Sequence, residues 1–355
     1  MNTYGNKIRL ALFGSSHSAE LGCVLSGLPA GKRIVMNPVL RMLARRAAAN
    51  GGPGATVRIE DDLPDIKSGL VSAGENGVLV TDGGPVEAVF RNGNIRKSDY
   101  SHIARPTHAD YTTFKKTGVL PESGGGVSSG RMTLPIVFAG AVCAEILKER
   151  GISVLGHVLR VGDVWDKRFD PMAPALDENA DPYFPLADNS VMPAMLRSIE
   201  EAKAAGDTLS CECECAITGV PAGVGEPFFN GVESTLSHLL FSIPGLRGVE
   251  FGEREHITGS QMNDGFTEGG LTQTNRSGGV NGGMANGMPI VFRAWFRPVP
   301  SIGIEQTGYD MEEDRPAPLT ITGRHDTCIL PRGLAAVEAA ASLCILDLME
   351  MNYER

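Results

Sequence analysis

Residues 334–351 constrain the fold most, because they predict a helix without a polar face. The segment is rich in alanine, and Val337, Ala341, Cys344 and Leu348 form a stripe that is apolar throughout. A helix that is apolar all round is buried in the core of a large protein. The sequence therefore predicts an internal helix over these residues.

Other helices are predicted from capping residues and stop signals. One opens at Asn37-Pro38 and ends before Gly51, and others cover residues 134–150 and 195–205. Strands are predicted over residues 8–13, 209–217 and 289–296, which are apolar and rich in β-branched and aromatic residues. Helices and strands are interspersed without a regular βαβ repeat, so we predict an α+β fold rather than a doubly wound sheet. Residues 165–189 and 308–318 are predicted to be mobile insertions.

Length and charge limit the class of protein. The chain has 355 residues, of which 42% are hydrophobic, and it carries a formal net charge of −10. The length allows two domains, but no linker or repeat divides the chain, so we predict a single domain over residues 1–355. An acidic chain lacks the basic footprint of a nucleic-acid binder. No nucleic-acid partner is therefore expected.

Cysteine usage and hydropathy indicate the compartment. The chain has 7 cysteines, an odd number scattered along the sequence, which does not suit a secreted disulfide framework. The first residues show no signal peptide, and no window approaches the roughly 18 apolar residues of a membrane span. We therefore expect a cytoplasmic protein without a membrane partner.

Two short patterns suggest functions that their contexts do not support. Cys211, Cys213 and Cys215 alternate as in a strand, where three such residues span about 13 Å and cannot meet one metal ion. Residues 126–130 match the G-x-S-x-G nucleophile elbow of hydrolases, but no strand precedes Ser128. We therefore predict a half-buried strand, no metal site and no hydrolase.

Polar loops carry the positive signal. His17, His108 and the pair His325-Asp326 each lie in a short loop with glycine or proline nearby, where functional residues concentrate. Five arginines accompany them: Arg46, Arg58, Arg105, Arg131 and Arg324. Taken alone, each of these residues is more often a solvated surface residue than a functional one. Together they indicate a site for a small molecule with several phosphate or carboxylate groups, because arginine binds both with paired hydrogen bonds.

Motifs spread along almost the whole chain resemble the chorismate synthase family. They are residues 13–17 (FGSSH), 27–31 (GLPAG), 105–111 (RPTHADY), 124–133 (GGGVSSGRMT), 219–227 (GVPAGVGEP), 278–283 (GGVNGG) and 323–326 (GRHD). The resemblance implies a β-α-β sandwich, with helices packed between antiparallel sheets, and a homotetramer. It also implies a lyase that uses reduced FMN to convert 5-enolpyruvylshikimate 3-phosphate to chorismate and phosphate. NADPH is a possible reductant of the flavin, because some members of the family use it so.

The resemblance also assigns roles residue by residue. His17 would protonate the departing phosphate, His108 would protonate the reduced flavin, and Asp326 would assist removal of the substrate's C6 proton. Substrate-binding positions are matched by Arg46, Arg105, Arg131 and Arg324. Flavin-contacting positions are matched by Ser128, Ser129, Gly282, Arg297, Ser301 and Arg324.

Several positions depart from the family's usual pattern. Val127 and Ala47 stand where members usually have arginine, and Met132 stands where they usually have glutamate. Arg297 replaces a lysine and keeps the charge. Because His17, His108 and Asp326 are all present, we favour a working enzyme. The alternative is a paralogue that binds flavin but has changed its substrate or lost turnover.

Overall fold

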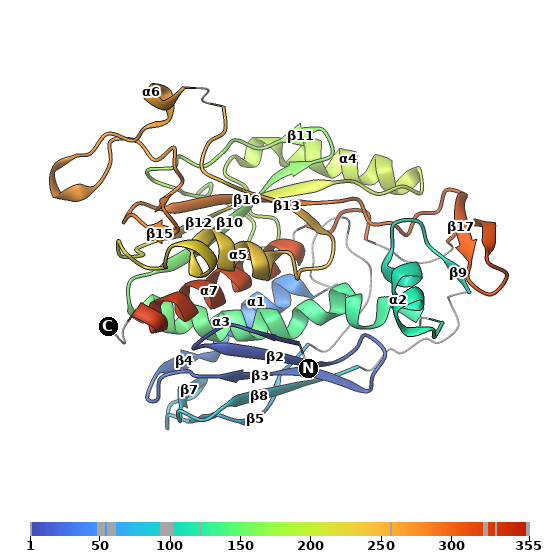
Figure 1. The fold of residues 1–355 in the computed structure, drawn as a ribbon, viewed down its shortest axis with the longest axis horizontal. Helices are drawn as coiled ribbons and strands as arrows, with labels where there is room; N and C mark the ends of the chain where they lie inside the picture. The colour runs from blue at the N-terminus through green and yellow to red at the C-terminus, as the bar shows by residue number, and fades with distance from the viewer. Residues whose placement is uncertain are drawn as a thin grey trace.

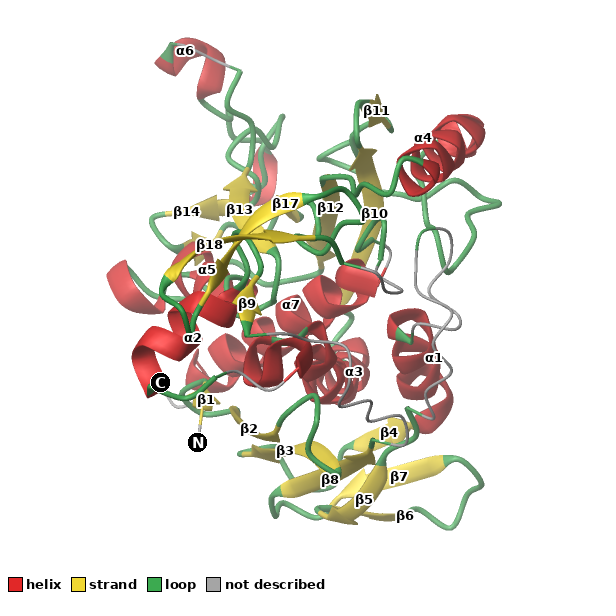
Figure 2. Cartoon of the chain, turned by 90° about the vertical axis from the view of Figure 1, so that its right-hand side faces the viewer, coloured by secondary structure: helices red, strands yellow, loops and turns green. Residues whose placement is uncertain are grey.

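Two antiparallel sheets enclose a layer of helices. The computed structural model describes residues 2–47, 54, 62–92, 102–120, 123–255, 258–321, 326–330 and 332–352. Figure 1 shows one sheet below the helices and the other above them, and Figure 2 shows the same layers from the side. The predicted β-α-β sandwich is confirmed.

The first sheet comes from the N-terminal part of the chain and the second from the middle. The five strands of the first are, in spatial order, β1 (Asn2–Tyr4), β2 (Arg9–Gly14), β3 (Glu20–Ser26), β8 (Val86–Arg91) and β5 (Asp65–Ser68). Those of the second are β11 (Val164–Trp165), β10 (Ser153–Val161), β12 (Cys211–Thr218), β16 (Ile290–Phe296) and β13 (Leu246–Phe251). All of these pairs are antiparallel, as expected for an α+β fold.

Smaller elements complete the two ends of the molecule. Three short sheets pair β4 (Arg33–Val35), β7 (Val78–Thr81) and β6 (Leu70–Ser72); β18 (Arg315–Leu319), β17 (Gln306–Asp310) and β9 (Ile103–Ala104); and β14 (Val280–Asn281) with β15 (Met284–Ala285). Outlying helices are α2 (Ala109–Thr117), α4 (Met192–Ala204) and α6 (Gly259–Met262). The short 3₁₀ helices are η2 (Ser123–Ser128), η3 (Gly130–Met132), η4 (Asn189–Val191), η5 (Phe228–Asn230) and η6 (Glu268–Gly270).

The helical layer is built around two apolar helices in close contact. Its members are α1 (Met36–Arg46), α3 (Thr133–Glu149), α5 (Val232–Leu240) and α7 (Arg332–Asn352). Small residues let α3 and α7 approach, because a Cβ on Gly140 would lie 2.2 Å from the carbonyl oxygen of Ala339. Val337, Ala341 and Cys344 of α7 are fully buried, which confirms the predicted internal helix.

The prediction that no segment of the chain is apolar enough to approach a membrane span is wrong. Residues 130–149 form a 20-residue helical stretch that contains an 18-residue window of mean hydropathy 1.5, long and apolar enough to cross a membrane by length and composition. However, 89% of this window is buried inside the protein, because the helix lies between the two sheets. Burial on both sides explains the composition, since a core helix needs no polar face.

The segments predicted to be mobile insertions are part of the fold. Phe169 and Ala187 pack with Ala216 and Val291 in a small apolar cluster against the second sheet. Asp166 anchors the same segment, because its carboxylate accepts hydrogen bonds from the backbone N–H groups of Ala187 and Asp188. Residues 308–318 form most of the β17–β18 hairpin. The acidic and proline-rich composition of these segments reflects turns, not loose chain.

Candidate active site

Two turns bring His17 and His108 to the same 3₁₀ helix. His17 lies in the turn between β2 and β3, where the backbone N–H of Ser16 donates to the carbonyl oxygen of Gly126 in η2 (3.2 Å). His108 precedes α2 and faces the same helix, because a Cβ on Gly125 would lie 3.3 Å from its Cε1 and 3.5 Å from its Nε2. The glycine-rich run therefore borders the imidazole of His108 and is bonded to the turn that carries His17.

A buried ion cluster orients His108. The Nδ1 of His108 lies 2.6 Å from Oδ1 of Asp110, and Nε of Arg105 donates to Oδ2 of the same carboxylate at 2.8 Å. Burial alone would raise the pKa of the Asp110 carboxyl, but hydrogen bonds from His108 and Arg105 and their charges outweigh it and hold the pKa well below its ordinary value. An ionised Asp110 can accept a hydrogen bond from Nδ1–H of His108, and Nη2 of Arg105 lies 3.0 Å from the same nitrogen. The Nε2 of His108 is thereby left for chemistry on the side of η2.

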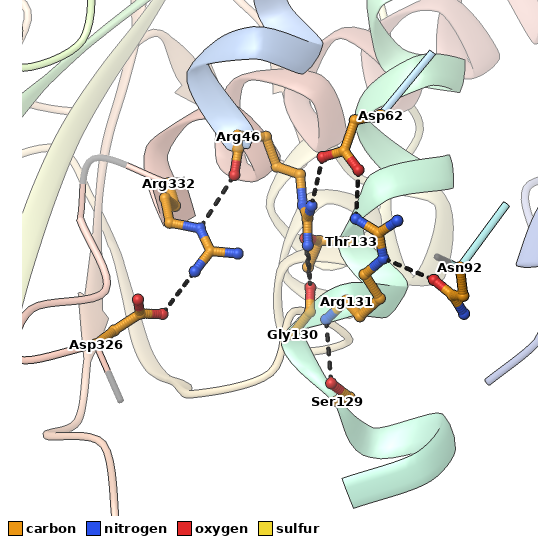
Figure 3. Close-up of polar contacts among 9 residues, drawn as sticks. All are labelled: Arg46, Asp62, Asn92, Ser129, Gly130, Arg131, Thr133, Asp326 and Arg332. Atoms are coloured by element: carbon orange, nitrogen blue, oxygen red, sulfur yellow. Dashed lines mark hydrogen bonds and ion pairs between the residues drawn. The ribbon is translucent and has the colours of Figure 1, made fainter. Parts of the chain in front are cut away.

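A second buried cluster holds two arginines on one carboxylate. Nη1 of Arg46, the last residue of α1, lies 2.9 Å from Oδ2 of Asp62, while Nη1 of Arg131 in η3 bonds to Oδ1 (Figure 3). The side chains of Arg46, Asp62 and Arg131 are only 1%, 5% and 7% exposed. Arg46 also donates to Thr133 and to the carbonyl oxygen of Gly130. Helix α1 and the start of α3 are therefore joined through guanidinium groups.

Asn92 connects this cluster to the turn of His17. Its Oδ1 accepts from Nε of Arg131 at 3.1 Å, and its Nδ2 donates to the carbonyl oxygens of Ser15 and Ser18. The sequence patterns gave no reason to choose Asn92. It follows β8 directly, so only the pairing of β8 with β3 places it beside the β2–β3 turn.

Asp326 lies on the other side of Arg46. Nη1 of Arg332 lies 2.7 Å from Oδ2 of Asp326, and Nε of Arg332 donates to the carbonyl oxygen of Arg46 at 3.0 Å (Figure 3). Asp326 is thus connected to the arginine cluster through backbone and side chain. Arg332 is a further residue that the sequence patterns did not indicate.

The residues matched to flavin positions differ in their surroundings. Ser301 accepts from Nη1 of Arg105 at 3.0 Å, and Ser129 accepts from the backbone N–H of Arg131 at 3.2 Å. Ser128 is exposed at the end of η2. Gly282 lies in the β14–β15 turn, which Figure 1 shows far along the molecule from α2, the helix that His108 precedes, so the structure does not bring it to His108. Arg58, Arg324 and His325 lie outside the described residues.

Arg297 indicates that the site suits an anionic cofactor. Its Nη1 donates to the carbonyl oxygen of Thr107, next to His108, at 2.6 Å. Its Nε is buried and has no hydrogen-bond partner among the described residues. Burial, together with the charge of Arg247, lowers the pKa of the Arg297 guanidinium. A bound phosphate would satisfy the unpaired N–H and offset the repulsion, so this residue fits a phosphorylated group such as FMN.

The three positions that depart from the family pattern differ in their exposure to solvent. Val127 is 65% exposed on η2, the 3₁₀ helix that Gly125 and Gly126 also belong to. Ala47 and Met132 are only 6% and 7% exposed and belong to the packed interior. An arginine at position 127 would therefore be solvated, whereas the other two positions need small or apolar side chains for packing here.

The two misleading patterns, the alternating cysteines and the G-x-S-x-G match, lie on a strand and in a 3₁₀ helix. Cys211, Cys213 and Cys215 are buried on β12, so the predicted strand is confirmed. It is not half-buried as predicted, because Glu214 on the other face is only 1% exposed and pairs with His157 and Arg293. Within the described part of the chain, no group of three or more His, Cys, Asp or Glu residues is placed to hold a metal ion. Ser128 ends a 3₁₀ helix and does not follow a strand, so the nucleophile elbow is absent at this position.

Comparison with known proteins gives one family. The model of the chorismate synthase family matches residues 8–349. Chorismate synthases of Methanocella arvoryzae and Nitratidesulfovibrio vulgaris are 38% and 37% identical to the chain, covering 98% of it and 94% and 97% of their own lengths. The chorismate synthase of Lancefieldella parvula is 32% identical over 98% of the chain and 95% of its own length.

The fold agrees with these sequence matches. A crystal structure of a chorismate synthase superposes with a TM-score of 0.72 at 22% identity, covering 98% of this chain and 93% of that one. The chain belongs to the chorismate synthase family.

Proposed function

We propose that the chain catalyses the reaction of its family, converting 5-enolpyruvylshikimate 3-phosphate to chorismate and phosphate by 1,4-elimination. One observation carries the assignment of the site. Residues that lie far apart in sequence are connected through the same few turns, in a chain that matches the family over residues 8–349. These residues are His17, His108, Arg46, Arg105, Arg131 and Asp326. The comparisons favour this activity over a paralogue with lost turnover, because the matches cover nearly the whole chain at 32–38% identity.

The arginines supply the anion site. Arg46, Arg105 and Arg131 are each held by a buried aspartate, which fixes the guanidinium planes before a ligand arrives. Preorganised donors stabilise charge that develops in the transition state without having to reorganise, and this is usually the largest catalytic contribution. We assign these arginines, with Arg324, to the phosphate and carboxylates of the substrate.

The histidines supply protons. His17 lies with its Nδ1 2.8 Å from the hydroxyl oxygen of Ser16, in the turn that faces η2, and we assign it to protonation of the leaving phosphate. His108 presents Nε2 to the glycine-rich helix and holds its other proton against Asp110, which suits a proton donor to the cofactor. Asp326, tethered by Arg332, is assigned to the proton that leaves the substrate. Imidazole titrates close to neutral pH and can therefore give a proton at working pH.

Reduced FMN would be held by Arg297, Ser301, Ser128, Ser129 and Arg324, and it supplies the transient electron density that lets the C–O bond to phosphate break. Arg297 and Ser301 both contact the segment that carries His108, through Thr107 and Arg105. Gly282 stays a prediction for the same role. The residues do not decide whether NADPH reduces the flavin.

Assembly and compartment follow from weaker support. We infer a single domain over residues 1–355, because one hydrophobic core joins residues from Ile8 to Met349. A homotetramer is consistent with the adjacent Phe228 and Phe229, whose side chains are 85% and 91% exposed in a single chain. A cytoplasmic location is consistent with seven free, buried cysteines.

The assignment is tested by an anaerobic assay with chemically reduced FMN, which removes the need to know the natural reductant. Purified protein should form chorismate from the enolpyruvyl substrate, and His17→Ala and His108→Ala should lose turnover while keeping the wild-type circular dichroism spectrum. If either variant keeps a near wild-type kcat, the role assigned to that histidine is wrong.

A further inference from the structure

Arg332 occupies a position that the physics of helices disfavours. It is the first described residue of α7, the 21-residue internal helix, and the described first turn of that helix contains no acidic residue. The N-terminus of a helix carries partial positive charge, so a cation there is unfavourable and an anion is favourable. Some other interaction must therefore compensate for this arginine.

The contacts of Arg332 supply that compensation. Nη1 lies 2.7 Å from Oδ2 of Asp326, and both side chains are largely buried, at 16% and 17% exposed. Nε donates at the same time to the carbonyl oxygen of Arg46, which ends α1. Figure 3 shows the guanidinium lying between these two partners. One planar group thus ties the loop of Asp326 to the helix that ends at an anion-binding arginine.

We propose that Arg332 is a positioning residue, which fixes the Asp326 carboxylate relative to Arg46 and so relative to the bound substrate. The proposal rests on the proposed function, since it gives Asp326 a role in proton removal. Arg332 itself does not enter the reaction. Arg332 contributes through its geometry, because a planar guanidinium can donate to two acceptors at fixed directions, whereas the ammonium group of lysine cannot.

The loop around Asp326 needs such a tether. Its backbone is held at Thr327, whose carbonyl oxygen accepts from the N–H of Leu209 and whose own N–H donates to the carbonyl oxygen of Gly54. These bonds place the backbone but leave the direction of the Asp326 side chain to its own contacts. The Arg332 fork restrains that direction, and precise orientation of reacting groups is worth large factors in rate.

A matched control lies on the same pair of helices. Arg45 of α1, next to Arg46 in sequence, and Glu338 of α7, six residues after Arg332, form an ion pair with N–O distances of 2.5 and 3.2 Å. Glu338 is 4% exposed, and among the described residues its carboxylate pairs with Arg45 rather than with the arginine cluster of Arg46 and Arg131. Glu338→Gln therefore perturbs the α1–α7 junction to a comparable extent without touching the proposed tether.

The kinetic test is a double-mutant cycle. Arg332→Gln should lower kcat by up to about a hundredfold while KM for the substrate stays close to wild type, because a misplaced group costs rate and not ground-state binding. Arg332→Lys should be intermediate and Glu338→Gln should keep kcat. In the Asp326→Asn background, Arg332→Gln should cause no further loss, because residues that act as a unit are not additive. A wild-type kcat in Arg332→Gln, or an equal loss in both backgrounds, would overturn the proposal.

A second readout does not depend on turnover. Hydrogen–deuterium exchange of the ligand-free protein should be faster over residues 326–330 in Arg332→Gln and unchanged there in Glu338→Gln. Unchanged exchange in Arg332→Gln would show that the side chain does not hold the loop. If the wild-type protein forms no chorismate, the proposed function fails, and the exchange result still decides whether Arg332 positions Asp326.

Discussion

Asp62 offers the sharpest test of how the arginine site is built. Asp62→Asn keeps the size of the side chain but removes the negative charge that Arg46 and Arg131 share. Breaking a buried ion pair by removing one partner costs about 3–5 kcal/mol. The amide oxygen of asparagine can still accept one hydrogen bond, so we expect the lower end of that range, about 3 kcal/mol.

The assay is urea unfolding at a fixed protein concentration, followed by circular dichroism. With a slope of about 3 kcal/mol per molar, a loss of about 3 kcal/mol moves the midpoint down by about 1 M. The matched control is Asp65→Asn in the same segment, because Asp65 is 44% exposed and pairs only with the equally exposed Lys67 among the described residues. An exposed pair of this kind is worth about 0–1 kcal/mol.

The same variant should also weaken the anion site. Without the Asp62 carboxylate, the guanidinium groups of Arg46 and Arg131 are no longer held side by side. The affinity for the phosphorylated substrate should therefore fall, although the net positive charge of the site rises. A simple charge model predicts the opposite sign, namely tighter binding. Equal unfolding midpoints for Asp62→Asn and Asp65→Asn, or tighter substrate binding by Asp62→Asn, would refute the claim that Asp62 organises these arginines.

Three further outcomes follow. Burial alone would lower the pKa of His157, but hydrogen bonds and charges from Asp166 and Glu214 outweigh it and raise the pKa above 6.5. The stability lost in His157→Gln should therefore be largest below pH 6.5 and shrink as the pH rises through the raised pKa. A difference in melting temperature between wild type and variant that does not change with pH would contradict this. Gly125→Ala should lower kcat, because the new Cβ would crowd the imidazole of His108. The loss of stability should be small and come from the backbone strain of an alanine at a φ of +92°. An unchanged kcat would place His108 outside the reaction. Val127→Arg adds a solvated charge to η2 and should tighten FMN or substrate binding by only about 0.2–1 kcal/mol, because an exposed ion pair contributes little. Calorimetric titration of both ligands tests this, and unchanged affinity for both would contradict it.

The sequence predicted individual helices and strands where local physics decides structure, whereas the layered arrangement was implied by the family resemblance. The apolar helix over residues 334–351 and the alternating strand around Cys213 follow from burial and periodicity, and both are observed. The short helices and strands of the first 130 residues were mostly missed. Many of them, such as β9 with its two residues, exist only because a distant partner pairs with them.

The candidate site was predicted unevenly for a related reason. His17, His108 and Arg105 lie in motifs with glycine or proline, and such signals are visible in a single sequence. Asp62 and Asn92 were not chosen as site residues, because their importance depends on which arginine they meet after folding. Contacts between segments that lie far apart in the chain leave no local pattern.

The central claim is that the chain is a lyase whose flavin undergoes no net redox change. Phosphorus NMR of an anaerobic reaction with a small amount of reduced FMN tests it directly, with chorismate followed in the same sample by absorbance. The account predicts one phosphate released per chorismate formed, over many turnovers, with the flavin still reduced at the end. Phosphate release without chorismate, or product limited to the amount of flavin and accompanied by its oxidation, would contradict it.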